Sequence, residues 1–493
     1  MLVLTVLTAW LAATAPVFSQ EAYYWTYAQN LDLSYFDHPP MMAWWIWLGT
    51  QVFGDGSVGI RLCTWLSGLA TTWIGVLLLR DFGIGTRGQV AWVLAGIVSP
   101  ILTMTHFLAN PDPPLVLGWT VVLWSLWRAR SSTAPGWWLL AGFAAGCGLL
   151  GKYSAVFLAC SGSLLLLLDP PLRRQLLRPW PWLAVVVAAA VFAPVVLWNM
   201  QHDYASFRFQ TSARFAKASL SSHWVLQLLV TQILVCHPLL AALAPAVVAW
   251  LLRSARRDAR ALWLLAFALP LPCYMAFQSL WIQVKINWLA PAYVPLLLGM
   301  VIWWQEQRQG RALAPRWAMI SLLLVPALLP FTPLLRLTPT TGGTSWTGWD
   351  ELARAGERWL HELDARDGKV GNVFAFSADY RDSSQLGRAR QLLRSDKTFV
   401  PHPAPTLAQN VWGRPGLQYD YWAQPASLIG QDAVYVLPRP GSDDKRRNDK
   451  VEHMQRVFTR AERVEHVVVD RLGIRVMDGD IWLCYGYRGP IND

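Results

Sequence analysis

Long apolar runs recur along the first two thirds of the chain, and they constrain its fold more than any other feature. From Met1 to Leu335, runs of about 15 to 25 apolar residues alternate with short polar hinges, and about 20 such residues let a helix cross the hydrocarbon layer of a membrane. Backbone polar groups in lipid must be paired within the segment, so such runs fold as helices. The sequence therefore predicts a mainly α, polytopic bundle of membrane helices.

The apolar runs predict about eleven transmembrane helices. Residues 1–17 lack the basic start and the cleavage site of a signal peptide, and we interpret them as part of the first span. Residues 40–53 are too few for a confident span and predict an amphipathic helix at the membrane surface, anchored by Trp44, Trp45 and Trp47. The predicted spans are 1–18, 57–79, 88–107, 113–127, 136–150, 153–168, 180–198, 224–251, 261–280, 288–304 and 317–335.

The C-terminal third has a different composition. From Arg336 to Asp493 charged residues, Gly and Pro are spread throughout, which is typical of a water-exposed domain. Two segments read as buried strands and two as helices. We predict a membrane domain at 1–336 and a small C-terminal α/β domain at 337–493. The expected strands are 370–377 and 432–437, and the expected helices are 349–365 and 383–393.

The distribution of basic residues predicts the orientation. The formal net charge is +11, which in a soluble protein would suggest nucleic acid, but much of the Lys and Arg falls in alternate hinges, so we predict no nucleic-acid partner. By the positive-inside rule these hinges are cytoplasmic. The other hinges and, with eleven spans, the C-terminal domain are then periplasmic. The cytoplasmic set is Arg80, Arg87, Arg128, Arg130, Arg173, Arg174, Arg178, Arg253, Arg256, Arg257, Arg260, Arg308, Arg311 and Arg316. The few basic residues opposite are chiefly Lys152, Arg208, Arg214, Lys217 and Lys285.

The predicted external hinges also contain carboxylates. The first hinge, 20–40, holds Glu21, Asp37 and His38 beside a Pro-Pro turn, and the second places Asp112 where a span begins. A carboxylate at membrane depth is costly unless it is used or paired. The alternative for Asp112 is that it caps the helix that follows it.

Cations share the same predicted surface. Lys152 lies between two apolar runs, where it either binds phosphate as a point charge or extends to the lipid headgroups. Arg208 lies among aromatics, and Arg binds phosphate in a bidentate manner. Lys285 adds another charge.

This combination indicates a reaction class. A carboxylate can accept the proton of an attacking hydroxyl while cations stabilise a departing phosphate. Asp37, His38 and Asp112 could also hold a divalent metal ion. Since the chain has no Gly-rich phosphate loop, a cytosolic nucleotide-sugar donor is not favoured.

Six ordered motifs resemble the GT-C superfamily of integral-membrane glycosyltransferases. The most similar branch is that of bacterial relatives of dolichyl-phosphate-mannose protein mannosyltransferases and of the lipid A aminoarabinose transferase. Residues 418–422 and 430–433 in the tail extend the similarity. The six motifs are EAYYW (21–25), FDHPPM (36–41), PDPPL (111–115), GKYSA (151–155), WNMQHDYASFRFQ (198–210) and NWLAPAY (287–293).

The resemblance implies an inverting glycosyltransferase in the bacterial inner membrane, with a polyprenyl-phosphate-sugar donor and a periplasmic glycan, lipid or protein acceptor. It implies roles for the matching residues. The expected catalytic residues are Glu21, Asp37 and Asp112. The expected donor-phosphate contacts are Lys152, Tyr153, Arg208 and Lys285. The expected substrate contacts are Tyr24, His38, His202 and Asn287.

One position departs from the family pattern. Relatives begin the first loop with an Asp-Glu pair whose Asp is the expected base, and this chain has Gln20 followed by Glu21. A glutamine cannot take a proton, so Glu21 is the first choice for the base, with Asp37 and Asp112 next. The rival hypothesis is a non-catalytic lipid-carrier binder, transporter or pseudoenzyme on the same scaffold. Against a transporter, the ionisable residues gather in hinges and not in mid-span helix breaks.

Overall fold

The computed structural model describes residues 1–213, 219–307, 320–338, 346–367, 372–394, 399–439 and 444–491. Within these ranges the chain forms two compact units. Unit 1 contains residues 1–13, 32–45 and 61–330, and unit 2 contains 14–31, 46–60 and 331–493. Two early segments thus belong with the C-terminal third. Two compact units do not show which residues lie in a membrane. The predicted boundary at residue 336 between a membrane domain and a water-exposed domain therefore stays a prediction.

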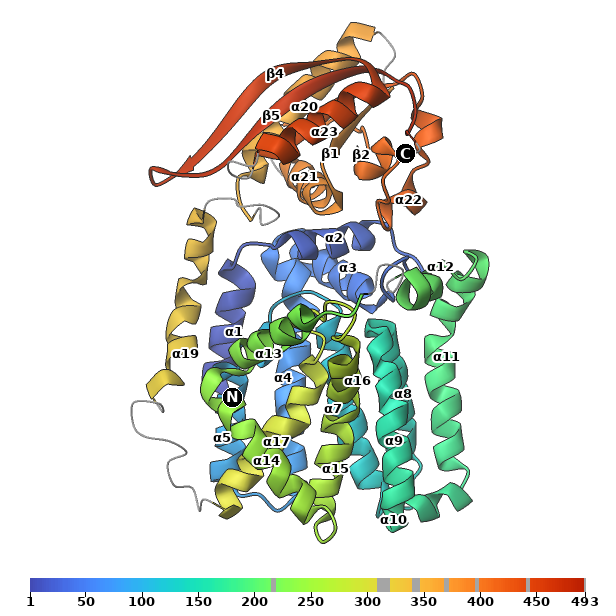
Figure 1. Cartoon of the computed structure of the whole chain (residues 1–493), viewed down its shortest axis with the longest axis vertical. Helices are drawn as coiled ribbons and strands as arrows, with labels where there is room; N and C mark the ends of the chain where they lie inside the picture. Colours follow the sequence, from blue (N-terminus) through green and yellow to red (C-terminus); the bar gives the residue numbers. More distant parts are fainter. Residues whose placement is uncertain are drawn as a thin grey trace. The chain divides into compact units, whose positions relative to one another are not determined.

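Unit 1 is a bundle of helices (Figure 1). Its core is a large apolar cluster in which Trp119, Trp263 and Phe267 are fully buried. The elements that lie wholly or mainly in it are α1 (Leu2–Thr14), α4 (Ser57–Asp81), α5 (Thr86–Val98), α6 (Pro100–Met104), α7 (Asp112–Ala129), α8 (Gly136–Gly151), α9 (Phe157–Leu168), α10 (Pro170–Arg174), α11 (Trp180–Gln201), α12 (Ala205–Arg208), α13 (Ser222–Cys236), α14 (Pro238–Ser254), α15 (Ala259–Ala268), α16 (Pro270–Gln278), α17 (Ala290–Gln307) and α19 (Leu324–Leu328).

The predicted number of eleven spans is not confirmed. Among the described residues, three helices are long and apolar enough to cross a membrane, or six if each of three bent helix pairs forms one span. Predicted span 224–251 is two helices that meet at 105°, with His237 between them at φ 94°. Predicted span 88–107 breaks at Ser99. The last span, 317–335, is described only from residue 320, and Arg214, Lys217, Arg308, Arg311 and Arg316 lie outside the described residues.

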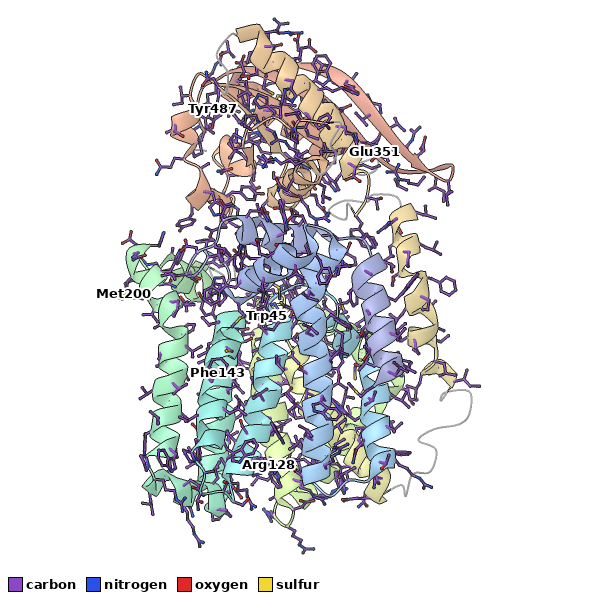
Figure 2. All side chains as sticks on the ribbon, turned by 180° about the vertical axis from the view of Figure 1, so that it is seen from behind. Trp45, Arg128, Phe143, Met200, Glu351 and Tyr487 are labelled. Carbon is purple, nitrogen blue, oxygen red and sulfur yellow. The ribbon has the colours of Figure 1, made fainter. Side chains whose placement is uncertain are left out.

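Two ends of unit 1 can be recognised from side chains. Figure 2 shows Arg128, from a hinge that we predict to be cytoplasmic, and Trp45, from the stretch after the first loop, towards opposite ends of the bundle. Arg128 donates to Asp81 at 2.6 Å, and Arg130 donates to Asp169 at 2.8 Å. Arg–carboxylate pairs of this kind tie neighbouring helix ends together. The stretch 40–53 is helical, as predicted, in α3 (Met41–Phe53), and its place at the membrane surface stays a prediction.

Unit 2 is built around one mixed five-stranded sheet of order β2-β1-β3-β5-β4. β1 pairs in parallel with β2 and β3, whereas β5 pairs antiparallel with β3 and β4. This confirms a small sheet-containing C-terminal part with helices. Its elements are α2 (Ser19–Gln29), α20 (Trp349–Asp367), β1 (Val373–Ser377), α21 (Tyr380–Leu393), β2 (Thr406–Leu407), α22 (Tyr419–Trp422), β3 (Asp432–Arg439), α23 (Asp444–Val457), β4 (Phe458–Arg471) and β5 (Ile474–Tyr487).

The sequence located some of these elements and missed others. Predicted strand 432–437 is β3, and predicted strand 370–377 is observed as β1, with residues 370 and 371 outside the described ranges. The two predicted helices are α20 and α21. The long hairpin of β4 and β5 was not predicted, because the charged residues of β4 mask the period-two pattern of a strand.

Candidate active site

The centre of the candidate site is a buried ion pair in unit 1. Lys152 Nζ donates to Asp112 Oδ1 at 2.7 Å, and the two side chains are 13% and 3% exposed. The Asn287 amide donates to Asp112 Oδ2. Both oxygens of one buried carboxylate therefore accept from residues of two other segments. Since a buried charge is stable only when it is paired and hydrogen-bonded, these contacts explain how Asp112 is accommodated.

Close contact between two helices brings Lys152 to Asp112. A Cβ on Gly118 would lie 2.7 Å from the Ala144 carbonyl oxygen, and one on Gly151 would lie 2.9 Å from Pro114 Cγ. Only glycine allows α7 and α8 to approach so closely. Lys152 directly follows α8 in an extended conformation with φ −158°, which ends the helix beside the start of α7.

The Asp112 carboxylate lies at the start of α7 and bonds to residues outside that helix. The N-cap residue of α7 is Pro111, whose side chain makes no cap hydrogen bond, and Asp112 is the first residue of the helix. Its backbone N–H donates to Asn110 Oδ1 at 2.9 Å. The carboxylate bonds with Lys152 and Asn287 instead of capping its helix, although a negative charge in the first turn of a helix is still favourable.

The first loop is fixed against the end of α11 within the same unit. Trp198 Nε1 donates to Asp32 Oδ2 at 2.9 Å, and the Gln210 amide donates to the Asp37 carbonyl at 2.7 Å. His202 stacks on Trp198, with ring centroids 4.0 Å apart. The side chain of Asp37 is buried and lies beside His38, with Oδ2 and Nε2 3.9 Å apart. These hydrogen bonds fix the position of this part of the loop, and with it the position of Asp37.

Tyr153 connects the Lys152 segment to the residues after α11. Its hydroxyl lies 2.7 Å from Ser206 Oγ, and its ring packs edge-on against Phe207. Arg208 and Lys285 are exposed on the same unit. Of the predicted residues in unit 1, the structure thus joins Asp112, Lys152 and Asn287 directly, and it places Tyr153 beside Ser206 and Phe207.

Glu21 and Tyr24 belong to unit 2. Glu21 is fully buried in the first turn of α2, and its Oε2 accepts from the Phe18 backbone N–H at 3.0 Å. The Gln20 amide donates to the Tyr24 hydroxyl at 3.2 Å. Gln20 therefore contacts a neighbour on its own helix, and Glu21 accepts from the backbone at the start of that helix.

Several polar residues of the site were not singled out from the sequence. Asp32, Asn110, Ser206 and Gln210 each bond to a predicted residue or to its immediate neighbours. Asp32 had a usable signal, because it is a further carboxylate in the first external loop. The others are common hinge residues, and only their three-dimensional neighbours distinguish them.

The side chains that could hold a metal ion are spread out among the described residues. No group of three His, Cys, Asp or Glu gathers among them. Asp37 and His38 are neighbours, but both oxygens of Asp112 are engaged by Lys152 and Asn287. A divalent ion bound by Asp112 would have to displace an ammonium group from it. The metal expected from Asp37, His38 and Asp112 stays an untested prediction, and no step below depends on it.

Comparisons with known proteins agree with this fold. Residues 37–198 match the family described as dolichyl-phosphate-mannose-protein mannosyltransferase. The lipid A galacturonosyltransferase RgtD of Rhizobium johnstonii is 27% identical over 65% of this chain and 67% of that protein. An undecaprenyl phosphate-α-4-amino-4-deoxy-L-arabinose arabinosyl transferase of Pseudomonas fluorescens is 29% identical over 62% of this chain and 55% of that protein. The match thus spans about half to two thirds of these relatives.

Solved structures show the same fold over nearly the whole chain. ArnT from Cupriavidus metallidurans in the apo state has a TM-score of 0.63 at 16% identity, covering 97% of this chain and 96% of that one. Its structure bound to undecaprenyl phosphate has a TM-score of 0.61 at 17% identity, with 97% coverage of both chains. The chain therefore has the fold of these ArnT structures. The family match and the relatives named as sugar transferases confirm the resemblance to the GT-C superfamily of membrane glycosyltransferases.

Proposed function

We propose that this protein transfers one sugar from an undecaprenyl-phosphate carrier to a periplasmic acceptor. The observation that carries the proposal is the buried Asp112–Lys152 pair at the start of a membrane helix. The relative named as a lipid A galacturonosyltransferase favours a lipid A acceptor over a polysaccharide or a protein. The basic hinges opposite the first loop favour an active site on the periplasmic face and a periplasmic C-terminal domain.

The reaction is a single displacement that inverts the anomeric carbon. An acceptor hydroxyl gives its proton to a carboxylate, and its oxygen bonds to the anomeric carbon. The bond from that carbon to the phosphate oxygen breaks, and undecaprenyl phosphate leaves with the electron pair. Lys152, Arg208 and Lys285 supply positive charge for the departing phosphate, an electrostatic effect that is large in a site of low dielectric constant.

The carboxylates differ in what they can do. Asp112 already accepts from Lys152 and Asn287 with its two oxygens, so we assign it to holding Lys152 in place and not to proton transfer. Glu21 stays the first choice for the base, and Asp37 is the second. Tyr24, His38 and His202 are assigned to substrate contacts, with Tyr153 beside the phosphate.

The test follows release of undecaprenyl phosphate from purified protein given undecaprenyl-phosphate sugars and lipid A. We expect turnover with at least one pentose or hexose donor, and loss of about a hundredfold or more after Glu21→Gln and Asp37→Asn together. Asp203→Asn is the matched control, since Asp203 is exposed in another predicted external hinge and Asn tolerates its φ of 51° equally well. Full activity of the double variant would reject this assignment of the base.

A non-catalytic lipid-carrier binder is the second candidate, and Gln20 favours it. Such a protein would bind undecaprenyl phosphate through Lys152 without turning over any donor. Binding that Lys152→Met abolishes, combined with no turnover across a panel of donors and acceptors, would support this candidate.

A further inference from the structure

The short helix that carries Glu21 is packed into the C-terminal part of the chain. Within unit 2, α2 lies against α21, and Figure 1 shows these helices side by side. Tyr23 of α2 contacts Tyr380 at 4.7 Å between ring centroids, and Tyr27 contacts Trp422 edge-on at 5.7 Å. The buried Tyr23 hydroxyl accepts from the Gln418 backbone N–H at 3.2 Å. The tail motif at 418–422 therefore packs against α2.

One buried hydrogen bond reaches the start of α2 directly. The Gln385 amide, on α21, donates to the Val17 carbonyl oxygen at 2.9 Å, and its side chain is 3% exposed. Val17 C=O and Phe18 N–H belong to one peptide group. That Phe18 N–H is the donor to Glu21 Oε2 at 3.0 Å. Gln385 and Glu21 thus bond to opposite ends of the same peptide.

A peptide group is planar, so fixing the direction of its C=O also fixes the direction of its N–H. A donor on the carbonyl also polarises the group, which strengthens the hydrogen bond that its N–H donates. Gln385 therefore controls both the orientation and the strength of the bond to the Glu21 carboxylate.

We infer that Gln385 is a positioning residue that sets the Glu21 carboxylate through the Val17–Phe18 peptide. The inference rests on the proposed role of Glu21. It gives the C-terminal part of the chain a direct function in the reaction, which is to hold the helix of the base in its working geometry.

The test compares Gln385→Met with Gln391→Met in the full-length protein. Met keeps the length of the side chain and removes the amide donor. Gln391 lies further along α21 and is half-buried, so the same change there is a matched control. Deuterium uptake of the 19–29 segment is measured together with kcat and with KM for the donor.

We expect Gln385→Met to raise deuterium uptake at the start of α2 and to lower kcat between about tenfold and a hundredfold, because a displaced catalytic group loses that much rate. KM should stay within about twofold, whereas a damaged donor site would raise KM. An unfolded fraction would also lower the apparent kcat at constant KM, but it would raise deuterium uptake outside α2 as well, so unchanged uptake elsewhere excludes it. The control should change neither quantity. If Gln385→Met does not fold, Gln385→Glu keeps the side-chain shape while replacing the amide donor with an acceptor.

The two proposals can fail separately. Unchanged uptake and kcat in the Gln385 variants would overturn the positioning role. Absence of turnover in the wild-type protein would reject the proposed function. Increased deuterium uptake at α2 in Gln385→Met, but not in Gln391→Met, would still support the connection from Gln385 to Glu21 through the Val17–Phe18 peptide. Equal changes in both variants would show a general effect on α21 and would also overturn the inference.

Discussion

Lys152 donates to Asp112 across 2.7 Å, although the two residues are 40 positions apart. The pair joins the end of α8 to the start of α7 and places a cation at one end of the helix bundle of unit 1. The contribution of the pair to the stability of the protein depends on how deeply the two side chains are buried. With both side chains mostly buried, removing one partner leaves the other charge uncompensated.

Breaking this pair should therefore affect both stability and activity. Asp112→Asn is expected to destabilise the protein by about 3 to 5 kcal/mol, because it leaves the Lys152 ammonium buried without its counter-charge. Asp112→Asn combined with Lys152→Met should recover much of that stability and none of the turnover. Thermal unfolding in detergent and release of undecaprenyl phosphate measure the two effects. Recovery of both together would show that the pair is purely structural.

The close approach of α7 and α8 gives a prediction about packing. Gly151→Ala is expected to destabilise the protein by about 1 to 3 kcal/mol, since the added carbon would contact Pro114 and the Leu115 backbone. Gly162→Ala is the control, because a Cβ there meets nothing within 4 Å. That change should be neutral or stabilise the helix by about 0.5 to 1 kcal/mol. Equal unfolding temperatures for the two variants would contradict the described helix contact.

Gln20 offers a test of whether the site is a weakened enzyme. Gln20→Asp restores the acidic pair of the resembled family at the start of α2, and we expect it to raise turnover by about tenfold or more, as a positioned base does. Gln29→Asp makes the same change at the exposed far end of α2. Higher turnover in Gln20→Asp but not in Gln29→Asp supports a catalytic site. An equal increase in turnover in both variants would indicate a general effect of charge on the helix.

Metal removal should have little effect. Lys152 and Asn287 engage both oxygens of Asp112, and no three-residue cluster of metal ligands gathers among the described residues. We expect turnover after EDTA treatment and desalting to stay within about twofold of the untreated value, a small effect compared with loss of a Lewis acid. Loss of activity that Mg²⁺ or Mn²⁺ restores would show that a metal is needed.

The sequence predicted the individual charges of the site better than their partners. Asp112 and Lys152 stood out because charges at membrane depth require a use or a partner. Their pairing could not be read from the sequence, because it depends on how closely Gly118 and Gly151 let two helices approach. Asn287 lies 175 positions from Asp112, and no local pattern connects them.

The fold shows the same division between local and non-local information. Hydropathy located the helical segments, but a break such as the one at His237, with φ 94°, depends on backbone geometry that composition does not encode. The strand β3 was found because it is a buried apolar run, whereas β4 carries charges along its exposed positions. Nothing in the sequence indicated that residues 14–31 would pack with the last third of the chain.

That last arrangement has a consequence for how the protein is made. Gln385 is synthesised 368 residues after Val17, a delay of about 20 to 70 s at ordinary rates of translation. During that time the helix that carries Glu21 has been synthesised, but Gln385, which holds its start in place, has not. If the proposed roles hold, the nascent chain lacks its full catalytic rate until α21 has folded against α2. The rate then depends on a contact between an early and a late part of the chain.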